Sequence, residues 1–142
     1  MKNRMALVTM MMIAVAAAPA MGLFRRKKHA PDAALCGLRT VYVSGNSEAA
    51  VIARKKIGKL TWLRLVSDKS KADSVLELSD RKSVREFPLP MATDTVSAEL
   101  KRGTKLLWSG SAHFDEGPLN SGAGSATKIV LDELNRAASC GK

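Results

Sequence analysis

In the first half of the chain, the spacing of hydrophobic and polar positions is that of a strand in some segments and that of a helix in another. β-Branched and aromatic residues at 40–43 predict a strand, and the Ser-Gly-Asn-Ser sequence at 44–47 predicts the turn that ends it. Asn46 or Ser47 is placed to cap a helix of about four turns. Its apolar face recurs at spacings of three and four, at Ala50, Ala53, Ile57 and Leu60. Short apolar runs at 62–66 and 75–78 predict two further strands.

The second half predicts a hairpin followed by a helix. Residues 79–90 are polar and include two prolines, which cannot donate to a strand ladder, so we expect a loop or a sheet edge there. Alternating residues at 95–100 and 105–112 flank a turn at 101–104 and predict a β-hairpin. A connector rich in Gly, Pro and Ser then leads to a helix at 125–138.

This order of elements predicts the fold class. A strand, a helix, four strands of which the last two form a hairpin, and a final helix suit an α+β domain. We expect two helices packed on one face of a mixed sheet. The chain from residue 38 to residue 142 has the length of one compact domain with one core, and it shows no internal repeat.

The amino terminus has the pattern of a secretory signal peptide. Lys2 and Arg4 precede an uncharged run at 5–18, and small residues follow at 18–20. Cleavage after Ala20 is expected, with cleavage after Gly22 as the fallback, because cleavage after residue 18 would leave a proline first in the mature chain. The predicted organisation is a signal peptide at 1–20, a basic flexible leader at 21–37 and one α+β domain at 38–142.

A retained anchor is the alternative for this segment. Residues 6–24 are uncharged and just long enough to cross a bilayer as a helix. The basic cluster that follows could then stop transfer on the cytoplasmic side. We therefore expect an exported protein, periplasmic or extracellular, with anchoring to the inner membrane by an uncleaved segment as the alternative.

Positive charge is concentrated near the start of the chain. The net charge is +10, and removing residues 1–20 takes away two positive charges and no negative ones, which leaves +8. Half of this excess lies at 25–28. Clusters of this kind can contact anionic lipid, although a solvated leader is the simpler interpretation. The candidate anion or lipid contacts are Arg25, Arg26, Lys27, Lys28, Arg54, Lys55, Lys56 and Lys59. Aromatic side chains for base stacking are scarce, so we do not expect nucleic acid as a partner.

The two cysteines bracket the predicted domain. Cys36 precedes its first strand and Cys140 follows its last helix. In an oxidising compartment a disulfide between them is the expected state, tying the two ends of the domain together. Two cysteines without histidines or further cysteines at ligand spacing do not predict a metal site.

No motif in the chain predicts catalysis or a cofactor. His113 could act as a base oriented by Asp115, but as near neighbours in sequence they are more simply polar groups at a strand end. A nucleophile elbow is absent. The Gly-rich stretch at 117–127 departs from phosphate-loop and dinucleotide-loop patterns at Ala123 and Thr127, and predicts a flexible entry to the last helix, whose first N–H groups could hold a stray anion.

Several local sequences resemble small bacterial envelope domains. These are Leu65-Val66-Ser67-Asp68, Ala72-Asp73-Ser74-Val75-Leu76 and the hairpin Gly103-x-x-Leu106-x-Trp108-Ser109. Together they are similar to the amino-terminal domain of the TolB protein and to the core of CsgG-type outer-membrane proteins. The resemblance implies an α+β envelope module with no catalytic residues to transfer. The propeller that follows in TolB and an obvious pore-forming strand are missing from this chain.

These observations lead to one functional expectation and two alternatives. We expect an exported, non-catalytic envelope protein that binds an unidentified envelope protein or a cell-surface polymer, without a metal or cofactor. The first alternative is a polyanion-binding protein that uses the basic leader and the basic helix face. The second is a small hydrolase, for which the sequence offers least support.

Overall fold

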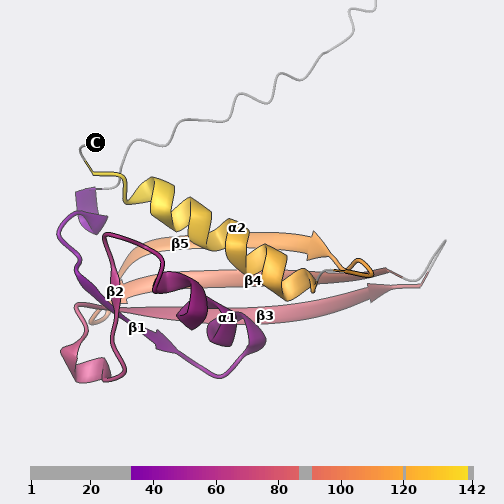
Figure 1. Cartoon of the computed structure of the whole chain (residues 1–142), viewed down its shortest axis with the longest axis horizontal. Helices are drawn as coiled ribbons and strands as arrows, with labels where there is room; N and C mark the ends of the chain where they lie inside the picture. The colour runs from indigo at the N-terminus through magenta and orange to yellow at the C-terminus, as the bar shows by residue number, and fades with distance from the viewer. Residues whose placement is uncertain (1–32, 87–90, 120, 141–142) are drawn as a thin grey trace, which may run out of the picture.

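The computed structural model describes residues 33–86, 91–119 and 121–140 (Figure 1). The elements in chain order are η1 Ala33–Leu35, β1 Thr40–Ser44, α1 Glu48–Ile57, β2 Arg64–Leu65, η2 Lys69–Lys71, β3 Ser74–Arg85, β4 Met91–Arg102, β5 Lys105–Asp115 and α2 Gly122–Ala137. The strands form one mixed sheet in the order β2-β1-β3-β4-β5. Both helices lie on the same side of this sheet (Figure 1), so the predicted α+β architecture is confirmed.

Parallel and antiparallel pairing divide the sheet into two parts. β1 runs parallel to both β2 and β3, and the crossover from β1 to β2 is made by α1. β3, β4 and β5 form an antiparallel meander, with Ala98 paired to Leu78 on one side and to Gly110 on the other. The predicted hairpin is β4–β5, and its turn contains Gly103 at a φ of 59°, a conformation that favours glycine.

The start of α1 follows the sequence prediction, whereas its end does not. The Ser47 hydroxyl accepts a hydrogen bond from the N–H of Ala50 at 3.1 Å, as an N-cap should. The helix ends at Ile57, almost one turn before the predicted apolar face runs out. At this end the N–H of Leu60 donates to the carbonyl of Ile57, three residues back, so the last turn tightens and leaves the α-helical pattern.

β3 extends seven residues beyond its predicted end. Residues 79–85 continue the strand and pair with β4 from Ser97 to Met91. Pairing with β1 has already ended at Glu77, so among the described residues this part of β3 has one neighbouring strand, β4. Of the two options offered for this stretch, the sheet edge is the right one for 79–85, and the two prolines lie outside the described residues.

The second strand and the last helix also differ from their predicted bounds. β2 is reduced to Arg64–Leu65, and the indole N–H of Trp62, just before it, donates to Oδ1 of Asn135 on α2 at 2.8 Å. α2 begins at Gly122, three residues earlier than expected, with the hydroxyl of Ser121 accepting from the N–H of Gly124.

One hydrophobic core fills the space between the helices and the sheet. Its sheet side is formed by alternate residues of the paired strands, and its helix side by the apolar faces of α1 and α2. The largest fully buried side chains are Leu35, Ile57, Leu63, Leu76, Leu100 and Leu134. The other face of the sheet carries mostly polar side chains, among which the hydroxyls of Ser97 and Ser111 lie 3.3 Å apart.

Candidate functional site

The predicted disulfide is present and joins the two ends of the described domain. The Cα atoms of Cys36 and Cys140 lie 5.8 Å apart, and 104 positions separate the two residues in sequence. Each cysteine lies close to a buried apolar residue, Leu35 on η1 and Ala138 after α2. Residues 33–37, which the sequence places in the leader, are therefore attached to the domain through the core and through a covalent bond.

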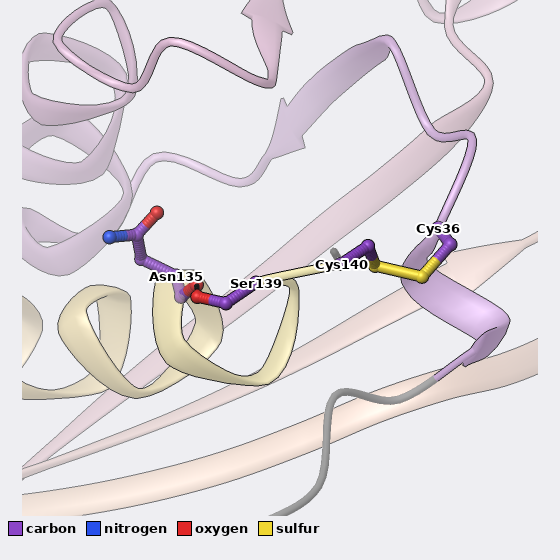
Figure 2. The surroundings of a disulfide bond; sticks show 4 residues. All are labelled: Cys36, Asn135, Ser139 and Cys140. Atoms are coloured by element: carbon purple, nitrogen blue, oxygen red, sulfur yellow. Dashed lines mark hydrogen bonds between the residues drawn. A yellow bond between two sulfur atoms is a disulfide. The ribbon is translucent and has the colours of Figure 1, made fainter. Parts of the chain in front are cut away.

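A shallow hollow lies beside this disulfide. It has a volume of about 270 Å³ and is bordered by both cysteines, Trp62, Asn135 and Ser139. Figure 2 shows the Asn135 amide pointing away from the sulfur atoms. Its Oδ1 accepts a hydrogen bond from the indole N–H of Trp62. None of the described side chains that line the hollow carries a charge. These residues therefore offer hydrogen-bonding and apolar contacts, without a general acid or base among them.

The basic residues predicted on α1 differ in how they are used. Arg54 donates to the backbone carbonyls of Val43 and Gly45, and thereby fastens α1 to the end of β1. Lys55 and Lys59 are exposed, and Lys56 is half-buried. The predicted basic face is therefore smaller than expected, because Arg54 is bonded within the fold and Lys56 is partly covered. The candidate contacts Arg25, Arg26, Lys27 and Lys28 lie outside the described residues, so the anion or lipid contact stays a prediction.

The structure places His113 and Asp115 on the exposed, polar face of β5. Asp115 accepts a hydrogen bond from the hydroxyl of Thr93 at 2.6 Å, across the β4–β5 ladder. His113 lies opposite Thr95 and is solvent-exposed. This carboxylate is engaged by a neighbouring strand, as expected for a polar group at a strand end.

The Gly-rich entry to α2 packs against a carboxylate. Asp94 is 6% exposed. A side chain at Gly122 would overlap Asp94 and would come within 2.8 Å of the carbonyl oxygen of Phe114. The absence of a Cβ at Gly122 therefore allows close contact between the start of α2 and the sheet. A negative side chain already lies at the positive end of this helix, which argues against the stray anion considered from sequence.

Two clusters of charged side chains were not found from sequence. The ammonium group of Lys82 lies 2.6 Å from Glu116; the shared hydrogen bond lowers the pKa of Glu116 and raises that of Lys82. On the opposite face, Lys101 lies 2.7 Å from both Glu77 and Glu99. Hydrogen bonds to Glu77 and then Glu99 raise the pKa of Lys101 to about 12. The pairing of β3 with β4 brings Lys101 next to Glu77, and Lys82 reaches Glu116 across β4 because β5 lies on its other side. The sequence predicts the β4–β5 hairpin but not the pairing of β3 with β4.

Neither a metal site nor a membrane-spanning helix is seen in the described part of the chain. Within residues 33–86, 91–119 and 121–140, no three His, Cys, Asp or Glu side chains are grouped so that they could hold a metal ion. The same residues include no helix of the length and hydropathy needed to cross a bilayer. The candidate anchor at 6–24 lies outside them.

Comparison with known proteins identifies the fold and no sequence family. No protein-family model matches the chain, and no curated protein matches it in sequence. Among solved structures, a point variant of the PelC dodecamer from Paraburkholderia phytofirmans has 16% identity and a TM-score of 0.50, over 72% of this chain and 90% of that one. The hypothetical protein CT253 from Chlamydia trachomatis has 7% identity and a TM-score of 0.53, over 73% and 99%. Lipoprotein GNA1162 from Neisseria meningitidis matches more loosely, with 18% identity and a TM-score of 0.44 over 70% and 98%.

The matches to PelC and to CT253 confirm the α+β fold that the resemblance implies. The chain shares its α+β architecture with PelC and with CT253, at identities too low to transfer a role from either. The narrower likeness to the TolB amino-terminal domain and to CsgG-type proteins stays a prediction.

Proposed function

We propose that this chain is an exported, non-catalytic module of the cell envelope, which acts by docking onto another envelope protein or a cell-surface polymer. The observation that carries the proposal is the Cys36–Cys140 disulfide. Such bonds persist in oxidising compartments outside the cytosol. Export is also what the signal-peptide pattern at residues 1–20 indicates.

The arrangement of the polar side chains supports a binding role over catalysis. Asp115 is held by Thr93, Arg54 is held by the end of β1, and Asp94 lies against the start of α2. The hollow at the disulfide offers an indole, an amide and hydroxyls as its polar groups. A fold shared with PelC, which was solved as a dodecamer, adds support for a module that works through assembly and contact.

Binding of polyanions is the second candidate, favoured by one specific observation. Lys55 on α1 and Lys59 just after it are exposed, and sequence places four further cations at residues 25–28. Elution from heparin separates the candidates, because a polyanion site loses affinity steeply between about 50 and 200 mM salt. The K55Q/K56Q/K59Q variant should elute with the parent protein if α1 only provides a solvated surface. A large shift of this variant to lower salt would favour the second candidate.

Export and disulfide formation are tested together by fractionation and intact mass. The untagged protein from its native cells should be found in an envelope fraction, with a mass of residues 21–142 less two hydrogens. A full-length, reduced product in the cytosol would contradict the proposal. A full-length, oxidised product in the membrane fraction would support the anchored alternative.

Docking is tested by chemical crosslinking in intact cells. The tagged full chain should give a discrete adduct, either with a protein band or with a polymer ladder that a glycosidase collapses. A matched control lacks residues 2–20, stays in the cytosol and should give no such adduct. Equal adducts from both forms, or none from either, would contradict the envelope role.

A further inference from the structure

We propose that the open edge of β5 is a self-association site, at which β5 pairs antiparallel with β5 of a second copy of this chain. Within the described residues β5 is the last strand of the sheet and pairs only with β4. It is eleven residues long, whereas β2, at the other edge, has two. An edge of that length presents a row of hydrogen-bonding groups to which a second strand can be added.

The hydrogen-bond pattern shows which residues present these groups. The N–H of Glu116 donates to the carbonyl of Ala92, in register with the β4–β5 ladder. Bonded pairs recur at every second residue of an antiparallel ladder. Counting back from Glu116, the even-numbered residues of β5 as far as Trp108 therefore bond to β4. The N–H and C=O groups of Ser109 and Ser111 point to the open edge.

As far as the structure describes the chain, the middle of β5 lacks the usual protection of an edge strand. Residues 106–112 contain no charge and no proline, the features with which sheet edges are commonly blocked. The only irregularity in the described β4–β5 ladder is the bulge opposite Leu100 and Lys101, which interrupts the first residues of the strand. The regular, unprotected part is 108–112.

The sequence around Gly110 is complementary to itself. In an antiparallel pair centred on Gly110, Ser109 lies opposite Ser111, and Trp108 lies opposite the small Ala112. A large side chain opposite a small one fills the face of the sheet between the two strands.

The position of α2 above this edge is compatible with a twofold axis between the two β5 strands. α2 packs over both β4 and β5, so two copies of the helix would lie about two strand spacings, or about 10 Å, apart, which is the distance of packed helices. Gly122 lies beside Phe114. From there, rises of about 1.5 Å per helical residue and 3.3 Å per strand residue place Ile129 level with the Gly110–Ser111 region.

Ile129 lies on the side of α2 that faces away from α1 and toward the second copy. Gly124 and Asn135 mark the side of α2 that contacts α1 and Trp62, through Ile52 and the indole N–H respectively. At 100° per residue Ile129 lies about 120–140° from both. Its side chain is 36% exposed. A second copy would cover it with the equivalent isoleucine near the twofold axis.

The pairing is tested with two single-cysteine additions in separate preparations of the full chain, both with the native disulfide intact. Ser109→Cys and Ser111→Cys should form a covalent dimer under mild oxidation at least tenfold faster when mixed than when either is oxidised alone, because 109 faces 111 and not itself. The matched control mixes Ser111→Cys with Ser83→Cys, an exposed serine on β3. A mixture that crosslinks no faster than this control would overturn the proposal.

A second variant tests the same edge without crosslinking. Ser111→Pro removes an N–H that points away from β4 and so leaves the β4–β5 ladder intact. Light scattering at about 100 µM should show a dimer for the parent protein and a monomer for this variant, with unchanged circular dichroism. A monomeric parent protein, or a dimer that persists in the Ser111→Pro variant, would overturn the proposal. A parent protein that binds an added partner protein but does not associate with itself would overturn it as well.

Discussion

The indole of Trp108 lies directly against Gly110, two residues further along β5. A Cβ built on Gly110 would come within 2.5 Å of two ring carbons of this indole. Successive even residues of a strand share a face, so the ring lies along its own strand over a residue that has no side chain. This contact keeps Trp108 half-buried at the edge of the sheet and makes Gly110 a packing requirement.

Gly110→Ala should therefore destabilise the domain. The added methyl displaces the Trp108 ring, and overpacking of this kind costs about 1–3 kcal/mol. Urea unfolding should show the loss as a lower midpoint. Gly58→Ala is the matched control, because Gly58 has an ordinary helical φ of −57° and open space around it. If both alanine variants unfold at the same urea concentration, the described packing of Trp108 is wrong.

Removal of the disulfide should cost more than any surface substitution. Joining residues 104 positions apart restricts the unfolded chain, which in the chain-entropy model stabilises the fold by about 4–5 kcal/mol. The C36S/C140S variant should unfold at a much lower urea concentration than the oxidised parent protein. Reductant should lower the midpoint of the parent and leave that of the variant unchanged. A parent protein insensitive to reductant would contradict the described bond.

Asp73 should contribute to acid sensitivity. Its carboxylate accepts from the N–H groups of Arg39 and Thr40, each at 3.0 Å, and these bonds hold its pKa below the ordinary value of an aspartate. A carboxyl group with a lowered folded pKa stabilises above its unfolded pKa, and this contribution is lost as pH falls through the folded value. Below about pH 4 the stability advantage of the parent over Asp73→Asn should shrink.

Unfolding in urea at several pH values between 7 and 2.5 measures this difference. Asp132→Asn, which removes an exposed carboxylate from α2, is the control for a change of one charge. A gap between the parent and Asp73→Asn that stays constant down to the lowest pH would refute the role of these hydrogen bonds.

Lys101 should offset the repulsion between two neighbouring carboxylates. Glu77 and Glu99 are directly paired across β3 and β4, and Lys101 contacts both. Lys101→Met should lower the urea midpoint at pH 7 in low salt, because like charges opposite each other in a sheet are unfavourable. The loss should shrink in 1 M salt, where charges are screened over about 3 Å.

The alkaline limit of this cluster follows from the raised pKa of Lys101, about 12. The stability that protonated Lys101 contributes is fully present below pH 10.5 and is lost as the pH rises through the pKa of the folded state. Introducing Glu77→Gln together with Lys101→Met should recover most of the stability lost at pH 7. A double variant no more stable than Lys101→Met would exclude repulsion as the cause.

The local elements that sequence predicts well are those with a local physical cause. Ser47 caps α1 because its hydroxyl can reach an N–H three residues away, and the turn at Gly103 needs a positive φ. The disulfide was predictable because both cysteines lie just outside the predicted elements. Each of these features depends on neighbouring residues or on chemistry that is visible in the sequence.

The features that were not predicted depend on contacts between distant segments. Residues 79–85 are exposed along their whole length, so they show no alternation from which a strand could be inferred. Trp62 leaves its predicted strand to bond with Asn135, 73 positions away. The early start of α2 depends on the fit of Gly122 against Asp94. Strand order and the charged clusters likewise follow from pairings that no local pattern specifies.

The covalent link between Cys36 and Cys140 has a mechanical consequence. Tension applied to the polypeptide on the amino-terminal side of Cys36 and on the carboxy-terminal side of Cys140 passes through the sulfur atoms and bypasses the sheet and both helices. In Figure 1 the far ends of β3 and β4 extend away from the corner where η1 and the end of α2 meet. The domain can thus be pulled by its ends without being unravelled, while the strands at its opposite end bear no load.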